Sequence, residues 1–471
     1  MIAQILDSIV AILWGPPLQV TLIGAGVYLC VISKFWHIRH FTDAFRYCFF
    51  PKNTKEESDS SKILPYQAAS VAIAGSIGSG NIGGVASAVA LGGPGAIFWM
   101  WITAMVGMMT KMVEVTLAVY YRDAESDGRY VGGPLFYIEK GIRPKCKLWW
   151  ILAILFGSGI FLQLILAPES FTVGESLQEL TGIRALYCSA FFSAMCWIVI
   201  LGGLKRVVKF AALMMPLMSA LYILFGLYVI VLNVSQLPSA IALIVTSAFT
   251  PAAAVGGFAG STIMLTARTG IARGLFSNEA GWGTSPMIHA AADNKHPVEQ
   301  GMWGIMEVFI DTMIICTITG LVIVVTGEWS SGQAGATLTS RSFAHGIGRF
   351  SPYFISISLF LFCWTTVTGW FSYYQGIVEY VFKNHSKIKR YMIKFLELST
   401  PLYGFLIALM IDVWNVDLAY AWLVVDISSA LPTFFNLIAV VWLSKKFLAI
   451  VRDYEGPKKL WGAKEYDKIE V

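Results

Sequence analysis

Long apolar tracts separated by short polar loops are the dominant pattern of this chain. Residues 63–110 contain no Asp, Glu, Lys or Arg, and residues 207–267 contain only Lys209. A helix of about 20 apolar residues is long enough to cross the hydrocarbon core of a bilayer. The pattern therefore predicts an all-α polytopic protein embedded in the lipid bilayer, with about eleven transmembrane helices.

The apolar tracts also give the approximate positions of these helices. The stretch 237–253 is apolar but carries prolines near both ends, so we interpret it as a re-entrant or interfacial piece rather than a span. The tract at 256–292 is unusually long and is interrupted by glycines and a proline. We expect spans near residues 13–33, 66–91, 95–121, 149–177, 184–204, 208–233, 256–292, 299–327, 352–382, 392–412 and 416–444.

Lys and Arg residues are divided unequally between the two sets of loops. One set holds 28 of the 34, and the other holds three, Arg184, Arg341 and Arg349. Loops rich in Lys and Arg face the cytoplasm. We therefore expect a protein of the cell (inner) membrane with its N-terminus outside and its C-terminus inside. The basic set comprises loops 34–65, 122–148, 205–209, 293–298 and 383–394 and the tail from 445.

The amino-acid composition supports a membrane protein and limits which kinds of partner and cofactor we expect. Only 13% of the 471 residues are charged, whereas a soluble protein carries about 25%. The net charge of +5 comes from the basic loops, so we expect no nucleic-acid partner. The seven cysteines show no C-x-x-C spacing, and we expect them to be small apolar filler rather than disulfides or metal ligands. No obligate protein partner and no organic cofactor is evident.

The stretch GSGNIG, residues 78–83, has the Gly-x-Gly-x-x-Gly spacing of dinucleotide-binding folds. That fingerprint requires an acidic residue about 20 positions later, and here the first acid is Glu114. A close-packing face of small residues is an alternative. However, five glycines fall between residues 75 and 84, and each costs a helix about 1 kcal/mol. The density predicts a helix that is broken inside the membrane, as at the binding sites of secondary transporters.

A second tract of this kind lies in the other half of the chain. Within 256–292, Gly274, Gly281, Gly283 and Pro286 interrupt the apolar pattern. Two interrupted segments at corresponding positions of two halves indicate an inverted-repeat transporter. We expect an extra N-terminal helix with a basic loop (1–65), a first five-helix repeat (66–233), a connector (234–255), a second five-helix repeat (256–444) and a cytoplasmic tail (445–471).

The chain resembles the alanine or glycine:cation symporters, which have the leucine-transporter fold with a 5+5 inverted repeat. The resemblance extends from about residue 66 to residue 382 and rests on the order and spacing of several motifs. These are GSGNIGGVASAVALGGPGAIFWMW, TKMVEVTLAVYYR, GGFAG, ARGLFSNEAGWGTSPMIHAAA and TTVTGWFSYYQ. It implies a symporter that takes up a small neutral amino acid with Na⁺ by alternating access.

The resemblance also implies which residues form the site. Backbone N–H groups at Ser79 and Gly80 would hold the substrate carboxylate, and Asn81 would stabilise the break or contact the substrate. Trp370 would wall off the substrate side chain and so exclude bulky amino acids. Na⁺ takes oxygen ligands. Its implied ligands are Ala74, Ile77, Thr365 and Thr366, and further substrate contacts are implied for Phe276, Ser277, Asn278 and Thr366.

One segment departs from the family pattern. Where the family carries GNMVQANS, this chain reads LAPESFTV at residues 166–173. Glu169 then replaces a substrate-contacting glutamine, Phe171 replaces an asparagine, and Pro168 is unexpected. Glu169 would bind the substrate ammonium or carry a proton. A proton-coupled carrier of a different small amino acid or related substrate is therefore the alternative function.

Charged residues inside the membrane are functional candidates because they are costly to bury. Lys111 and Glu114 are three apart on one helix face, and we expect an ion pair or, alternatively, a proton relay. Arg273 and Glu279 are a candidate gate that closes as a salt bridge. An intramembrane enzyme is not favoured, because G-x-S-x-G and H-E-x-x-H motifs are absent. A channel would need a polar lining that these spans do not offer.

Overall fold

The computed structural model describes residues 9–10, 13–50, 62–125, 128–166, 169–251, 256–416 and 418–456, and these are almost entirely helical. The first half contains α2 (Pro16–Ile32), α3 (Trp36–Arg39), α4 (Phe41–Phe49), α5 (Pro65–Ser76), η1 (Gly80–Gly84), α6 (Val85–Gly92), α7 (Gly95–Tyr120), β1 (Asp123–Ala124), β2 (Tyr130–Val131), α8 (Pro134–Tyr137), η2 (Ile138–Ile142), α9 (Trp149–Leu166), α10 (Glu169–Thr181), α11 (Ala185–Ile200), α12 (Gly203–Leu232), η3 (Val234–Gln236) and α13 (Leu237–Ser247).

The second half contains a similar series of helices. They are α14 (Ile263–Asn278), α15 (Pro286–His289), α16 (Pro297–Val308), η4 (Phe309–Cys316), α17 (Thr317–Val325), η5 (Glu328–Ser330), α18 (Gly335–Ile347), η6 (Gly348–Phe350), α19 (Ser351–Val381), α20 (Ser386–Trp414), α21 (Leu418–Trp442) and α22 (Ser444–Glu455). The segments η1, η2 and η4 are π-helical.

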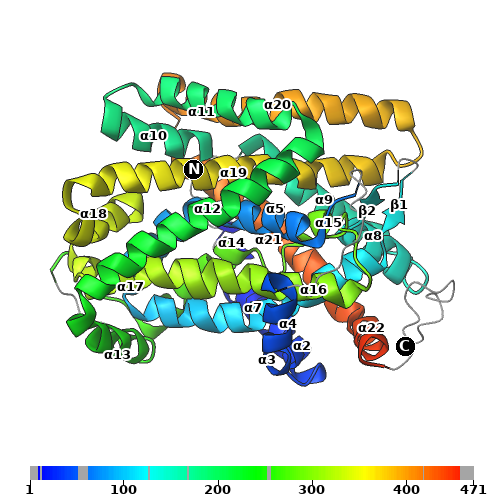
Figure 1. Cartoon of the computed structure of the whole chain (residues 1–471), viewed down its shortest axis with the longest axis horizontal. Helices are drawn as coiled ribbons and strands as arrows, with labels where there is room; N and C mark the ends of the chain where they lie inside the picture. Colours follow the sequence, from blue (N-terminus) through cyan, green and yellow to red (C-terminus); the bar gives the residue numbers. More distant parts are fainter. Residues whose placement is uncertain are drawn as a thin grey trace.

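Most long helices run along one direction, which is horizontal in Figure 1. Within the described residues, seven helices are long and apolar enough to cross a membrane, and four shorter helices are apolar as well. This confirms a polytopic helical membrane protein. The count of eleven spans and the boundaries of the two repeats stay predictions. The connector residues 237–247 form a helix, α13, which packs against α7 and α17.

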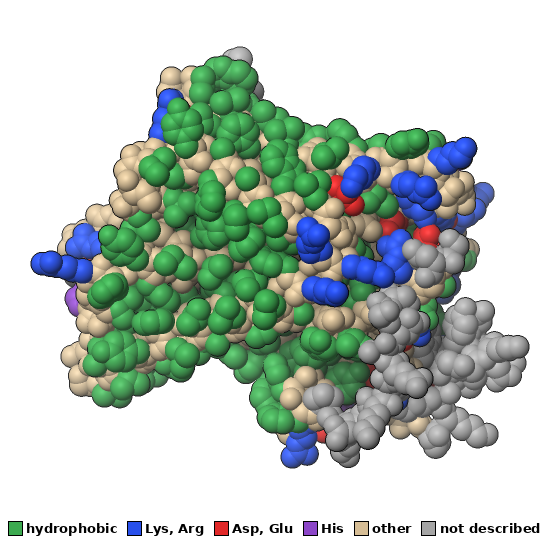
Figure 2. All heavy atoms as spheres, turned by 45° about the horizontal axis from the view of Figure 1, so that its top comes forward, with side chains coloured by type: hydrophobic (Ala, Val, Ile, Leu, Met, Phe, Trp, Pro, Cys, Tyr) green, Lys and Arg blue, Asp and Glu red, His purple; other side chains and the backbone are tan. Residues whose placement is uncertain are grey.

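The two ends of the bundle differ in charge. The hairpin of β1 and β2, together with α8 and α22, lies at one end, while α13 and α18 lie at the other (Figure 1). In Figure 2 the Lys and Arg side chains gather toward the first end, and a broad apolar belt covers the middle. The predicted cytoplasmic loops therefore share one end, and which side of the membrane this end faces stays a prediction.

The interior has one large apolar cluster, which includes residues of α5, and smaller clusters beside it, one of which includes Ile271 and Leu275 of α14. α7 packs against both α14 and α16, α19 packs against α5, and α9 packs against α21. The extra N-terminal helix α2 packs on α7 and α21, where Trp14 Nε1 donates to the Asp426 carbonyl at 2.7 Å. All seven cysteines are free, and six of them are buried. This arrangement places both interruptions in the centre of the protein.

Candidate functional site

The first interruption lies between α5 and η1. Helix α5 ends at Ser76, Ile77 is extended (φ −72°, ψ 99°), and the helix resumes as the π-helical η1 at Gly80. Asn81 holds this break, because its Oδ1 accepts a hydrogen bond from Gly78 N at 2.8 Å. The predicted break is therefore confirmed, and Asn81 stabilises it rather than lining the cavity described below.

The second interruption lies between α14 and α15. Helix α14 ends at Asn278, and Glu279 adopts a left-handed conformation (φ 51°) that ends the helix. Gly281 and Gly283 also have positive φ values, 93° and 75°, which glycine adopts at little cost. Pro286 then begins α15. The interruption therefore covers residues 279–285, as predicted from Gly281, Gly283 and Pro286. The prediction for Gly274 is wrong, because Gly274 lies inside α14, where the helix packs closely against Met100 and Thr103 of α7.

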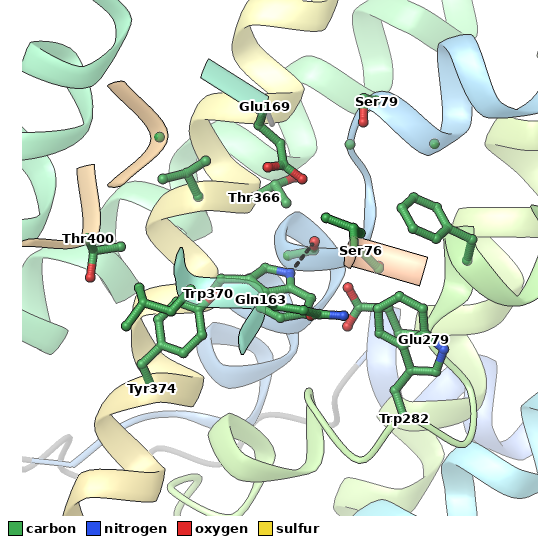
Figure 3. Close-up of a pocket in the computed structure, with 18 of the residues that line it drawn as sticks. Ser76, Ser79, Gln163, Glu169, Glu279, Trp282, Thr366, Trp370, Tyr374 and Thr400 are labelled. Atoms are coloured by element: carbon green, nitrogen blue, oxygen red, sulfur yellow. Dashed lines mark hydrogen bonds between the residues drawn. The ribbon is translucent and has the colours of Figure 1, made fainter. Parts of the chain in front are cut away.

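A cavity of about 80 Å³ lies between the two interruptions (Figure 3). Six of the predicted substrate residues line it, namely Ser79, Gly80, Glu169, Phe276, Thr366 and Trp370, and so does the predicted gate residue Glu279. The other three, Asn81, Ser277 and Asn278, are buried behind it. Helices α9, α10, α19, α20 and α21 supply the remaining wall.

Oxygen atoms converge beside this cavity at the first interruption. Thr366 Oγ1 lies 3.3 Å from the Ala74 carbonyl and 3.0 Å from the Ile77 carbonyl. Carbonyl and hydroxyl oxygens at an unwound helix are the ligands that hard monovalent cations take in secondary transporters. Three of the four predicted Na⁺ ligands are thus brought together. Thr365 instead bonds the Phe362 carbonyl at 2.9 Å and contacts Met218 Sδ at 3.3 Å.

Aromatic rings enclose one side of the cavity. Trp370 donates from Nε1 to the Gly75 carbonyl at 3.3 Å, which fixes its ring against the first break. The Trp282 ring lies 6.3 Å from the Trp370 ring and 5.7 Å from the Phe276 ring, in edge-on geometry. The predicted aromatic wall therefore has a second tryptophan from the other break. Trp282 sits in the family motif, but the sequence interpretation did not assign it a role.

Two polar side chains of the α9–α10 segment line the cavity, and each has one buried atom that makes no hydrogen bond. They are Glu169, through Oε2, and Gln163, through Nε2. Figure 3 shows the Glu169 carboxyl group near Thr366, and Gln163 near Glu279. Phe171 is buried in a separate apolar cluster with Ala185 and Ala408. Pro168 lies outside the described residues.

Asp311, a buried acid that was not predicted, bonds to residues next to both interruptions. Asp311 in η4 accepts hydrogen bonds from Asn81 Nδ2 at 2.7 Å, from Ser277 Oγ at 2.8 Å and from Thr312 Oγ1 at 2.7 Å. Asn278 Nδ2 donates to Thr312 Oγ1 at 3.1 Å. An aspartate inside an apolar span is a signal that could have identified this residue. In this structure Asn81, Ser277 and Asn278 are thus hydrogen-bonded behind the cavity, and their contact with the substrate stays a prediction.

The expected ion pair between Lys111 and Glu114 is wrong. Lys111 Nζ pairs with Glu307 Oε1 on α16 at 3.2 Å. Glu114 instead accepts a hydrogen bond from Gly281 N at 3.2 Å and another from Asn436 Nδ2. The spacing along the helix places Lys111 and Glu114 on the same face. Each of them nevertheless bonds to a residue on a neighbouring helix, Lys111 to Glu307 on α16 and Glu114 to Asn436 on α21.

The gate residues Arg273 and Glu279 are not paired with each other here. Glu279 Oε2 accepts a hydrogen bond from Thr284 Oγ1 at 2.5 Å, and the Arg273 guanidinium lies over the Phe276 ring at 5.8 Å. Phe276 lines the cavity, so Arg273 is one side chain removed from it. A gate that closes between Arg273 and Glu279 stays a prediction.

Comparison with known proteins identifies the family to which the chain is similar. The sodium:alanine symporter family matches residues 1–468. An uncharacterized transporter of Haemophilus influenzae is 37% identical over 100% of this chain and 99% of its own length. The sodium/alanine symporter AgcS of Methanococcus maripaludis is 33% identical over 94% of each chain.

The crystal structure of MhsT in complex with L-phenylalanine resembles this fold with a TM-score of 0.57. The match covers 89% of this chain and 95% of MhsT at 15% identity, so it shows the fold alone. The fold is thus that of the leucine-transporter type. The family match and the relatives show that the protein is a transporter rather than an enzyme. With the family profile matching almost the whole length, the chain belongs to the sodium:alanine symporter family, whose members are multi-pass membrane proteins.

Proposed function

We propose that the protein is a secondary active symporter that takes up alanine or glycine together with Na⁺ by alternating access. The observation that carries this proposal is the group of oxygens at the first interruption. Thr366 Oγ1 lies within 3.3 Å of the carbonyls of Ala74 and Ile77, directly beside the cavity. No Lys or Arg of the described part lines this cavity. A mobile cation can therefore supply the positive charge that the site lacks.

The substrate would bind across the cavity between the two interruptions. Its carboxylate would face the backbone N–H groups at Ser79 and Gly80, near the start of η1, because the first turn of a helix favours an anion. Its side chain would face Trp370 and Trp282, whose ring centroids lie 6.3 Å apart in the cavity wall. A relative that covers almost the whole chain is named a sodium/alanine symporter, which favours the same substrate class.

Proton coupling through Glu169 is the second candidate function. It is favoured by one observation, the Glu169 Oε2 atom that adjoins the cavity without a hydrogen-bond partner. A carboxylate in that position would be neutralised by a bound proton, or would accept a hydrogen bond from the ammonium of the substrate. Na⁺ coupling needs no change in the protonation of Glu169, so the two functions can be separated by experiment.

The test is uptake of radiolabelled alanine and glycine into proteoliposomes under an inward Na⁺ gradient, an inward H⁺ gradient, or neither. We expect accumulation above equilibrium only with Na⁺, in the wild-type protein and in Glu169→Gln. Accumulation driven by H⁺ alone, and lost in Glu169→Gln, would establish the second function instead. The absence of uptake of both amino acids under every gradient would overturn the proposed substrate class.

A further inference from the structure

Lys111 of α7 places its ammonium group inside the second interruption. Its Nζ lies 3.0 Å from the Glu279 carbonyl, 2.9 Å from Ser285 Oγ and 3.2 Å from Glu307 Oε1. The side chains of Lys111 and Glu307 are completely buried. The ammonium is therefore enclosed by a carbonyl, a hydroxyl and a carboxylate that come from the interruption and from α16.

These three oxygens have the chemistry of a cation site. The Glu279 carbonyl stands at the C-terminal end of the 16-residue helix α14, where the helix dipole places negative charge. Carbonyls at the ends of broken helices, together with hydroxyl and carboxylate oxygens, hold coupling ions in secondary transporters. The position of Lys111 Nζ is therefore one that a free cation would otherwise favour.

The stem of Lys111 is held tightly enough to keep the ammonium in place. α16 approaches α7 closely at Gly304, where a Cβ atom would lie 3.1 Å from the Lys111 carbonyl and 3.2 Å from its Cγ. A larger residue at position 304 would displace the lysine stem. Because Gly304 has no side chain, α16 can pack directly against the stem of Lys111. The Lys111 side chain is therefore closed off from solvent.

Among the described residues, Lys111 is the only Lys or Arg that contacts the acidic groups of this network. Glu114 and Glu279 lie close enough to interact with it electrostatically, and Glu307 pairs with it directly. Gln300 Nε2 lies 2.7 Å from His289 Nδ1, and His289 Nε2 lies 3.1 Å from Glu307 Oε2. Asp311, which lies further away, is occupied by donors of its own.

We propose that Lys111 is the resident cation of the second interruption, so that no Na⁺ binds there during transport. The inference rests on the proposed Na⁺ coupling and assigns the mobile ion to the first interruption alone. Lys111 touches neither the cavity nor the ion, and it acts as a positioning residue. Its ammonium holds the backbone of Glu279, whose side chain lines the cavity.

The test is the Na⁺ dependence of alanine uptake in Lys111→Ala. Na⁺ should enter the vacated site, so the Hill coefficient for Na⁺ should rise by about one, since it can increase with the number of sites. Alanine affinity should fall about tenfold at the Na⁺ concentration that saturates the wild type, and recover at higher Na⁺. Lys140→Ala is the matched control, because Lys140 pairs with Asp123 at 2.6 Å on the surface, and it should behave like the wild type.

Two further variants make the test decisive. In Lys111→Ala combined with Glu307→Gln the vacated site loses its carboxylate, so the Hill coefficient should return to the wild-type value. If Lys111→Ala does not fold, Lys111→Met combined with Glu307→Gln replaces it, and this variant should keep Na⁺-driven uptake with the wild-type Hill coefficient but a lower alanine affinity, because no ammonium holds the Glu279 carbonyl.

An unchanged Hill coefficient in an active Lys111→Ala protein would overturn the inference, as would a folded Lys111→Met/Glu307→Gln protein with the alanine affinity of the wild type. Alanine uptake by the wild type that does not depend on Na⁺ would instead overturn the proposed function. The two failures are therefore distinguishable.

Discussion

The first interruption presents neutral oxygens to the cavity, whereas the second is held by a buried ammonium group. At the first, Thr366 and the carbonyls of Ala74 and Ile77 converge with no Lys or Arg in contact within the described residues. At the second, Lys111 contacts the Glu279 carbonyl and Glu307. Neutral ligands can release an ion in every cycle, whereas a buried ion pair is costly to separate. The comparison suggests that one interruption exchanges its cation and the other keeps it.

Removing the carboxylate of the second interruption should have the largest effect. Glu307→Gln leaves the Lys111 ammonium buried without its partner, and breaking a buried pair in this way costs about 3–5 kcal/mol. We expect a large fall in the thermal denaturation temperature of the purified protein in detergent.

The matched variant for this prediction combines Lys111→Met with Glu307→Gln. It removes both charges, so most of the lost stability should return. A Glu307→Gln protein as stable as the wild type would show that the second interruption does not depend on its ion pair.

Crowding the first interruption should have an intermediate effect. A Cβ atom at Gly78 would lie 2.9 Å from Thr366 Oγ1, whereas a Cβ atom at Gly84 would meet nothing within 4 Å. Overpacking costs about 1–3 kcal/mol, so Gly78→Ala should raise the Na⁺ concentration for half-maximal uptake about tenfold. Gly84→Ala should match the wild type. If Gly78→Ala and Gly84→Ala had the same Na⁺ concentration for half-maximal uptake, Na⁺ binding would not depend on the geometry of the first interruption.

A surface ion pair outside both interruptions should have the smallest effect. Lys383 Nζ lies 2.7 Å from Glu139 Oε2 in the basic loops. Burial opposes ionisation of Glu139, but the ion pairs with Lys383 and Arg143 outweigh it and hold its pKa below the ordinary value. Exposed pairs contribute about 0–1 kcal/mol, so Lys383→Ala should lower the denaturation temperature only slightly at neutral pH.

The pH dependence of this small effect has a definite sign. A depressed carboxyl pKa adds stability above the pKa of the unfolded state, and this stability is lost as the pH falls through the folded-state pKa. The difference between Lys383→Ala and the wild type should therefore vanish in acid. A large effect of Lys383→Ala on Na⁺ affinity would mean that charges far from the interruptions also control the ion.

Local patterns in the sequence were sufficient to predict the helical membrane fold and both interruptions. Glycine density around residue 78 and the Gly-Pro pattern after residue 279 act within one helix, so they could be identified without tertiary information. The family motifs placed Thr366 and Trp370 beside the cavity, because their spacing along α19 fixes which face they share.

Contacts between distant helices were not predictable in the same way. Lys111 and Glu307 are 196 positions apart, and nothing local indicates that α16 brings the carboxylate closer than Glu114 does. Two of the three donors to Asp311, Asn81 and Ser277, are likewise more than 30 positions away. The partners of Glu169 could not be inferred from the sequence, because the departure at residues 166–173 removes the family precedent for that position.

The most direct test of the account is Na⁺ binding to purified protein in Thr366→Val and Thr368→Val. Both substitutions replace a hydroxyl on α19 by a methyl group, but the Thr368 hydroxyl bonds only carbonyls of its own helix, those of Trp364 at 2.8 Å and Thr365 at 3.2 Å. We expect Na⁺ affinity, measured by calorimetric titration in the presence of alanine, to fall about tenfold or more in Thr366→Val and to stay at the wild-type value in Thr368→Val. Equal Na⁺ affinities in the wild type and Thr366→Val would contradict the assignment of the mobile ion to the first interruption.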